Sequence, residues 1–200
     1  MKKKIIIISV LVLLVLFPIT GCETRKEDTN SNNSIPNDLS NEIKEDSNSV
    51  VLYFSATGTT KSIAQRIATL SNSDIIEIIP KEKYKSEDLN YNSDCRANRE
   101  QNDSSARPEI KNSIDITKYD TIYLGYPIWW GTTPKIILTL FDMYDFTGKT
   151  IIPFCTSGST GISGSVSDLK NYNSKLIIKD GRRFSSSDDD EIIKDFVDNN

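Results

Sequence analysis

Four continuous apolar segments of strand length, separated by segments of helical periodicity, constrain the fold of this chain most strongly. Segments that are apolar without alternation are typical of strands buried on both faces, and helices between such strands favour a parallel sheet. A shorter apolar segment adds a fifth strand. The sequence therefore predicts an α/β fold with a doubly wound five-stranded parallel sheet of strand order 2-1-3-4-5. The expected strands cover residues 50–54, 74–79, 121–126, 150–155 and 176–178.

The N-terminal 21 residues predict a signal peptide of the bacterial lipoprotein type. Three lysines precede an apolar run over residues 5–19, and Gly21 and Cys22 follow it. A basic start, an apolar centre and small residues at the end are typical of a secretory signal, and the run is shorter than the roughly 20 residues that span a bilayer. The ending Ile-Thr-Gly-Cys resembles a lipobox, which implies that Cys22 is lipidated. The alternative is an uncleaved anchor in which Cys22 has no role.

Residues 22–49 predict a disordered acidic and polar tether between the lipidated Cys22 and a folded domain over residues 50–200. Only Ile35, Leu39 and Ile43 are sizeable apolar residues there, so the segment cannot bury enough surface to offset its ordering entropy. Removal of residues 1–21, which hold three lysines and no acid, changes the net charge from −4 to −7. An anionic membrane repels such a domain. We therefore expect a lipid-anchored extracytoplasmic protein held away from the cell membrane by a spacer.

Composition excludes several classes of function. The chain has no histidine, which excludes a histidine general base, a Ser-His-Asp triad and histidine-ligated metal. Its acidic balance argues against a nucleic-acid partner, which would select a basic face. Three cysteines are too few and too scattered for a disulfide framework or a zinc ribbon. We expect no metal site and no residue that acts as a catalytic acid or base.

The loop after the first expected strand predicts a phosphate site. It leads into a helix, where outward backbone N–H groups and the helix dipole favour an anion. One glycine allows close approach of the backbone, and four hydroxyl groups can donate to phosphate oxygens. The alternative is a capped strand–helix turn that binds nothing. The loop residues are Ser55, Ala56, Thr57, Gly58, Thr59 and Thr60.

Two further loops follow the third and fourth expected strands, at the same edge of the sheet. The first holds both tryptophans side by side, and adjacent side chains cannot both point into one core, so we expect at least one ring to face the ligand crevice or solvent. A flat ring at the crevice suits a flat ligand by stacking. The second is rich in small residues, which lets backbone amides reach a ring edge. The alternatives are that both tryptophan rings fill a loop core and that the small residues form a flexible linker. The candidates are Pro127, Ile128, Trp129, Trp130, Gly131, Thr132, Thr156, Ser157, Gly158 and Gly161.

These loops resemble those of the flavodoxin family. The family pattern Thr/Ser-x-Thr-Gly-x-Thr matches residues 55–60 in full, and residues 126–131 resemble the loop after the third strand in a bacterial flavodoxin-like branch. The resemblance implies non-covalent FMN as cofactor, with its phosphate at residues 55–60 and its ring against Trp129 or Trp130. It also implies that backbone groups around Gly131 respond to the protonation state of the ring. The segment 81–118 is longer than a minimal member of the family needs. We expect it to form a partner surface or a lid.

Three functions compete. The favoured one is an FMN-binding electron-transfer protein whose partner is a redox protein or a small-molecule electron acceptor. The alternatives are an NAD(P)H-dependent quinone or nitro reductase of the same fold, and a non-redox binding lipoprotein that has lost FMN. Direct oxidation of a nicotinamide would separate the first two, and retention of flavin would separate both from the third.

Overall fold

The structure is a computed structural model that describes residues 41–42 and 47–200. The expected signal peptide, the lipidated Cys22 and most of the expected tether lie outside the described residues. Among the helices of the described part, none has the length and apolar character needed to cross a membrane.

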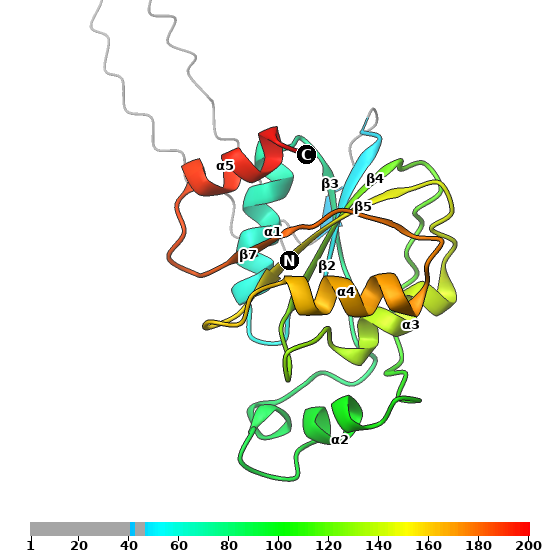
Figure 1. Cartoon of the computed structure of the whole chain (residues 1–200), viewed down its shortest axis with the longest axis vertical. Helices are drawn as coiled ribbons and strands as arrows, with labels where there is room; N and C mark the ends of the chain where they lie inside the picture. The colour runs from blue at the N-terminus through cyan, green and yellow to red at the C-terminus, as the bar shows by residue number, and fades with distance from the viewer. Residues whose placement is uncertain (1–40, 43–46) are drawn as a thin grey trace, which may run out of the picture. The chain divides into compact units, whose positions relative to one another are not determined.

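A twisted, largely parallel sheet forms the centre of the domain (Figure 1). In the order β3-β2-β4-β5, parallel pairing joins four strands that match the first four expected ones, and two short strands pair with the outer side of β5. The predicted order 2-1-3-4-5 is confirmed. The strands are β1 (Asn41–Glu42), β2 (Ser49–Tyr53), β3 (Asp74–Glu77), β4 (Thr121–Pro127), β5 (Thr150–Thr156), β6 (Ile177–Ile178) and β7 (Arg182–Phe184).

The fifth strand is broken into β6 and β7, and the sequence prediction missed the second piece. The amide of Lys179 still donates to the carbonyl of Ile151 (2.9 Å). Two residues further along β5, Pro153 lies beside the same outer segment but has no N–H group to donate to it. Gly181, with φ of 71°, passes so close that a Cβ there would lie 2.2 Å from the carbonyl oxygen of Pro153. The chain then resumes pairing as β7, which carries the following loop to the edge of the sheet where the strands end.

The expected disorder of residues 22–49 needs correction at two places. Asn41 and Glu42 form β1, which pairs antiparallel with β3 opposite Ile76 and Ile75. The physical reason is that β3 would otherwise be an edge strand with a row of free backbone groups that can pair with another segment. The domain also begins slightly earlier than expected, because β2 starts at Ser49.

Helices cover both faces of the sheet (Figure 1). On one face, α1 and α5 pack over β2 and β5 through Ile63, Ile67, Ile193 and Phe196. On the other face, α3 and α4 contribute a larger apolar cluster. The short helix α2 and a 3₁₀ turn lie apart from both layers. The helices are α1 (Thr59–Leu70), α2 (Arg96–Asn102), α3 (Lys135–Met143), α4 (Ser163–Tyr172) and α5 (Asp190–Asp198), with the 3₁₀ turn η1 at Ser86–Leu89.

Candidate functional site

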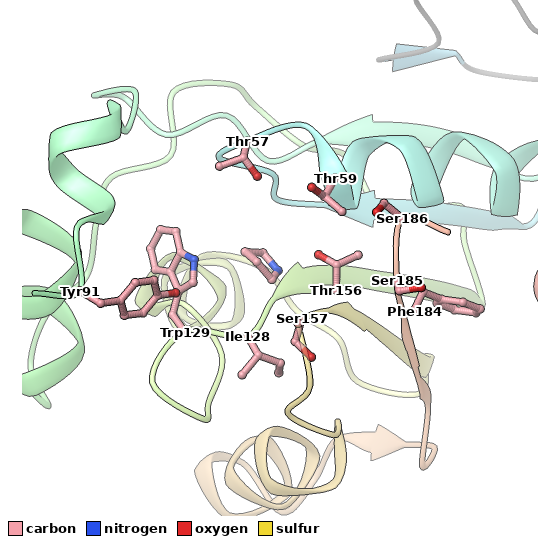
Figure 2. A pocket seen from close by; sticks show the side chains of 12 residues that line it. Thr57, Thr59, Tyr91, Ile128, Trp129, Thr156, Ser157, Phe184, Ser185 and Ser186 are labelled. Atoms are coloured by element: carbon pink, nitrogen blue, oxygen red, sulfur yellow. The ribbon is translucent and has the colours of Figure 1, made fainter. Parts of the chain in front are cut away.

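A cavity of about 490 Å³ lies at the edge of the sheet where β2, β4, β5 and β7 end (Figure 2). All three predicted loops reach it, together with Tyr91 from the 81–118 segment and residues from the end of β7 and the loop after it. Thr57 and Thr59 lie along one side, and Tyr91 and Trp129 lie at one end (Figure 2). The lining residues are Thr57, Thr59, Tyr91, Pro127, Ile128, Trp129, Thr156, Ser157, Gly158, Phe184, Ser185 and Ser186.

The first predicted loop ends at the N-terminus of α1, which no side chain caps. Gly58 takes a left-handed conformation (φ 93°) and has no side chain that could cap the helix. Its own amide donates to the Ser55 hydroxyl (3.1 Å), which fixes the loop. The first turn of α1 holds no acidic residue, so nothing there repels an anion. The positive end of the helix dipole and the hydroxyls of Thr57 and Thr59 therefore face the same space.

Thr60 does not line the cavity, although it belongs to the same motif. Its side chain is buried, and its Oγ1 shares a hydrogen bond with Oγ1 of Thr156 (2.8 Å). Thr60 thus links the first turn of α1 to the end of β5 through a buried hydrogen bond. Ser55 and Ala56 line a separate cavity of about 190 Å³ on the β3 side of the loop. The structure therefore places Thr57 and Thr59, and not the whole motif, at the larger cavity.

Residues 129–132 form a tight two-residue hairpin. Trp129 and Thr132 exchange two backbone hydrogen bonds, each 3.0 Å. The residues between them, Trp130 (φ 49°) and Gly131 (φ 83°), both have positive φ. Positive φ at both central positions is the signature of a type I′ turn. Gly131 accepts this conformation without strain, but Trp130, as a bulky side chain, does not.

The two tryptophans have different surroundings. Trp129 is only 4% exposed and meets the rings of Phe54 (5.5 Å between centroids) and Tyr84 (5.0 Å) edge to face, yet it still lines the cavity. Trp130 is half-buried, does not line the cavity, and lies on Tyr91 at 4.3 Å. Trp129 is therefore a core ring that also borders the cavity, whereas Trp130 sits at the outer side of the hairpin.

The 81–118 segment folds over the hairpin and is less polar inside than its sequence indicates. Tyr84 is buried, donates its hydroxyl to Glu100 (2.5 Å) and lies under the guanidinium of Arg96 (4.2 Å), which also bonds to Glu100 (2.6 Å). Burial, followed by the bond to Glu100, raises the pKa of the Tyr84 hydroxyl. From α2, the Gln101 amide reaches the backbone of the hairpin. The sequence analysis gave no role to Tyr84, Tyr91 or Gln101.

The third predicted loop reaches the cavity through Thr156, Ser157 and Gly158, whereas Gly161 does not line it. The Ser157 hydroxyl donates to the carbonyl of Thr160 and closes the loop on itself. A Cβ at Gly158 would meet no atom within 4 Å, so the backbone there borders open space. Arg183 of β7 donates to the carbonyl of Ser157 (3.1 Å) and holds the loop from the other side.

Phe184, Ser185 and Ser186 line the cavity, and the sequence analysis missed them. Phe184 ends β7, and Ser185 and Ser186 follow it. The strand β7 is too short and too basic to be recognised from the sequence. The run of three serines that starts at Ser185 was the available signal, because hydroxyl-rich loops after strands mark the other two sides of the site. The hydroxyl of Ser185 is bonded to Asp188 (2.8 Å), so the loop after β7 is braced.

Cys155 and Cys95 are both buried and free. Burial raises the pKa of the Cys155 thiol to about 12, so this thiol stays protonated at neutral pH and is a core side chain. Within residues 41–42 and 47–200, His, Cys, Asp and Glu side chains nowhere gather in a group that could hold a metal ion. No charged side chain is among those that line the cavity. The site therefore offers hydroxyls, backbone amides and aromatic rings.

The fold and the site define a class: a doubly wound α/β protein with a ligand cavity at the switch in strand order, where such proteins bind nucleotides. The family model described as flavodoxin matches residues 48–200. The chain therefore belongs to the flavodoxin family, and the resemblance seen in the sequence is confirmed.

Solved structures agree with this assignment. A protein of Bacteroides eggerthii described as a flavoprotein is 38% identical, with 76% of this chain and 96% of that chain covered and a TM-score of 0.72. A similar protein of Bacteroides uniformis is 37% identical, with coverages of 76% and 98% and a TM-score of 0.73. A flavoprotein of Lactobacillus acidophilus in complex with FMN is 28% identical, with coverages of 68% and 93% and a TM-score of 0.59. No curated protein sequence matches the chain.

Proposed function

We propose that this chain binds FMN without a covalent bond and transfers electrons through it. The observation that carries the proposal is the convergence of three separate loops on one cavity, with an uncapped helix N-terminus on one side and aromatic rings at one end. Bound FMN supplies the capacity to accept and release electrons. The protein supplies the binding, the orientation and the electrostatic surroundings. The FMN complex of the Lactobacillus acidophilus flavoprotein supports the same cofactor.

The cavity fits FMN in size and in the distribution of its chemistry. About 490 Å³ lies within the roughly 300–1,000 Å³ of ordinary small-molecule sites. The phosphate group matches the side with the first-turn amides of α1 and the hydroxyls of Thr57 and Thr59. The flat ring matches the end with Trp129 and Tyr91, because aromatic faces stack on planar ligands. Gly158 lets backbone groups approach the ring edge.

The lining supports electron transfer over reduction of a substrate by a nicotinamide. Neither a histidine, which the chain lacks, nor a charged side chain lines the described cavity, and the buried Cys155 thiol does not ionise at neutral pH. Histidine, carboxylate, lysine and cysteine side chains are the groups that most often transfer a proton to an organic substrate at a reacting centre. Transfer of electrons between FMN and a partner requires none. The partner is a redox protein or a small-molecule electron acceptor.

The test is a comparison of two activities of the purified, FMN-loaded full chain. Electron transfer predicts that the bound flavin is reduced by a low-potential reductant and is rapidly reoxidised by an artificial acceptor over many cycles. It also predicts that NADH and NADPH alone are oxidised no faster than by free FMN. Rapid oxidation of NADH or NADPH with a quinone or a nitro compound as acceptor would replace the proposal with the reductase function.

We also propose that the protein is held by a lipid on Cys22 at the extracytoplasmic face of the cell membrane. The basic start, the apolar run and the position of Cys22 support this. The test is fractionation of cells that express the full chain or the variant Cys22→Ser. The proposal predicts that the unchanged chain sediments with membranes and incorporates labelled fatty acid, and that the variant does not. Equal membrane association without fatty acid in both would contradict it.

A further inference from the structure

Gln101, on the last turn of α2, makes three hydrogen bonds to the backbone of another part of the chain. Its side-chain Nε2 donates to the carbonyls of Trp129 (3.3 Å) and Thr133 (3.1 Å). Its Oε1 accepts from the amide of Lys135 (3.1 Å). Gln101 therefore clamps the hairpin of residues 129–132 to the start of α3, although it comes from the 81–118 segment.

The start of α3 explains why a side chain from elsewhere is needed. The sequence indicates Thr133 as the cap and Pro134 as the first helical residue. In the structure the helix starts one residue later, at Lys135, and Pro134 occupies the cap position without a capping side chain. The amide of Lys135 would lack a partner within the helix. The Oε1 atom of Gln101 supplies that partner.

The hairpin itself needs an external clamp. Trp130 has a positive φ of 49°, a conformation that bulky residues adopt only where the surrounding structure holds them. Besides the two bonds between Trp129 and Thr132, the side chains of Gln101 from α2 and Asp168 from α4 form hydrogen bonds to the hairpin, and Asp168 accepts from the Thr132 hydroxyl (2.7 Å). Asp168 bonds to the side chain of Thr132, whereas Gln101 bonds directly to the backbone carbonyl of Trp129.

No other common side chain reproduces these contacts. The amide group of glutamine carries two donors and one acceptor on the same plane, and all three functions are used here. Glutamate has nearly the same shape but, when ionised, has no donor for the two carbonyls. Methionine has a similar length and neither function. Asparagine is shorter by one methylene group.

We propose that Gln101 is a positioning residue for the cofactor: it fixes the conformation of the Trp129–Thr132 hairpin and thereby sets the balance between the oxidised and reduced forms of the bound flavin. The inference rests on the proposed function, because it takes the cavity beside the hairpin as the flavin site. The two redox states of the ring differ in charge and in protonation, so a fixed set of backbone groups beside the ring stabilises them unequally. A hairpin free to change its backbone conformation would lose part of that difference.

The experiment compares the FMN-loaded full chain with Gln101→Glu, Gln101→Met and Asn102→Asp. Asn102 is the matched control, because it is exposed, neighbours Gln101 on α2, and bonds only within α2, to Asn98 (3.1 Å). Asn102→Asp introduces the same charge as Gln101→Glu one residue away, which isolates the hydrogen bonds from long-range electrostatics. Each variant is checked for folding by circular dichroism. The dissociation constant of oxidised FMN and the midpoint potential are then measured.

The proposal predicts that both Gln101 variants change the ratio of the affinities for oxidised and fully reduced FMN by about ten-fold, which is about 30 mV in the two-electron midpoint potential. Asn102→Asp should stay within about two-fold of the unchanged protein, as expected for an exposed site. Potentials of the Gln101 variants that match those of Asn102→Asp would overturn the proposal while FMN binding stands. Loss of folding in both variants would also overturn it, because Gln101 would then hold the fold. Absence of FMN binding by the unchanged protein would instead refute the proposed function.

Discussion

Thr60 and Thr156 share a buried hydrogen bond, with 2.8 Å between their Oγ1 atoms, that joins the first turn of α1 to the end of β5. The bond brings the phosphate-type loop and the loop after β5 to one place, so that Thr57 and Ser157 line a common cavity. A hydroxyl from a ligand-binding motif thus serves to assemble the site, while its neighbour Thr59 faces the ligand space.

Replacement of Thr60 by valine should lower the stability of the protein. Valine has the shape of threonine but leaves the buried Thr156 hydroxyl without its partner, which costs about 1–3 kcal/mol in the free energy of unfolding. The measurement is urea denaturation of the protein without cofactor. Thr59→Val is the control: it should change stability by less than about 0.5 kcal/mol and should weaken FMN binding. Equal stabilities for the two variants would contradict the assignment.

Replacement of Gly58 by alanine should cost about 1–2 kcal/mol, because an L-residue in the left-handed region brings Cβ close to its own backbone. A Cβ at Gly58 would meet no other atom within 4 Å, so the cost comes from backbone strain alone. Gly158→Ala is the matched control, since its surroundings are equally open and its φ lies outside the left-handed region. Thermal denaturation of both variants gives the comparison, and an equal loss would show that strain at Gly58 is not the cause.

The two tryptophans should differ sharply in their effect on stability. Trp129 is buried against Phe54 and Tyr84, so Trp129→Ala should cost about 3–5 kcal/mol, as large-to-small core substitutions do. Trp130 is half-buried on the exposed Tyr91, so Trp130→Ala should cost about 1 kcal/mol. Guanidinium denaturation followed by circular dichroism measures both. A larger loss for Trp130 would reverse the assignment of core and surface rings.

Cys155 should make the stability fall at alkaline pH. Burial raises the pKa of its thiol from 9.0 to about 12 in the folded protein. Above pH 9 the unfolded chain therefore releases a proton that the folded chain keeps, and the free energy of unfolding decreases by roughly 1 kcal/mol for each pH unit up to about pH 12. Urea denaturation from pH 8 to pH 11 gives the slope. Cys155→Ala removes the thiol, so its slope should be shallower above pH 9, whereas parallel curves would contradict the prediction.

The fold was predictable because its core strands are unbroken apolar segments with helices between them. That pattern is typical of a doubly wound parallel sheet. The strand β7 was not predictable, because Arg182 and Arg183 fill two of its three positions. Its pairing also depends on where Pro153 interrupts the pairing at the outer side of β5. The loops after β2, β4 and β5, which follow strands that were recognised, all reach the cavity. Ser185 and Ser186 were missed together with the strand that places them.

Side-chain contacts to distant backbone account for the rest of what the sequence could not predict. The hydrogen bonds of Gln101 to the hairpin leave no signal in the sequence, because every residue has a backbone carbonyl that could accept them. Thr59 lines the cavity and Thr60 is buried against Thr156, and which of the two takes each role depends on how α1 is rotated against the sheet. In both cases the residue type is compatible with several roles, and only the packing of α1 and α2 selects one.

The most direct test of the central claim is the visible absorption spectrum of the purified full chain before and after addition of FMN, together with its tryptophan fluorescence. FMN binding predicts flavin bands that stay with the protein through gel filtration and quenching of fluorescence at one FMN per chain. Thr59→Val should weaken this binding, whereas Asn102→Asp should retain it. A colourless protein that leaves added FMN free, with unchanged fluorescence, would contradict the account and favour a binding protein without redox chemistry.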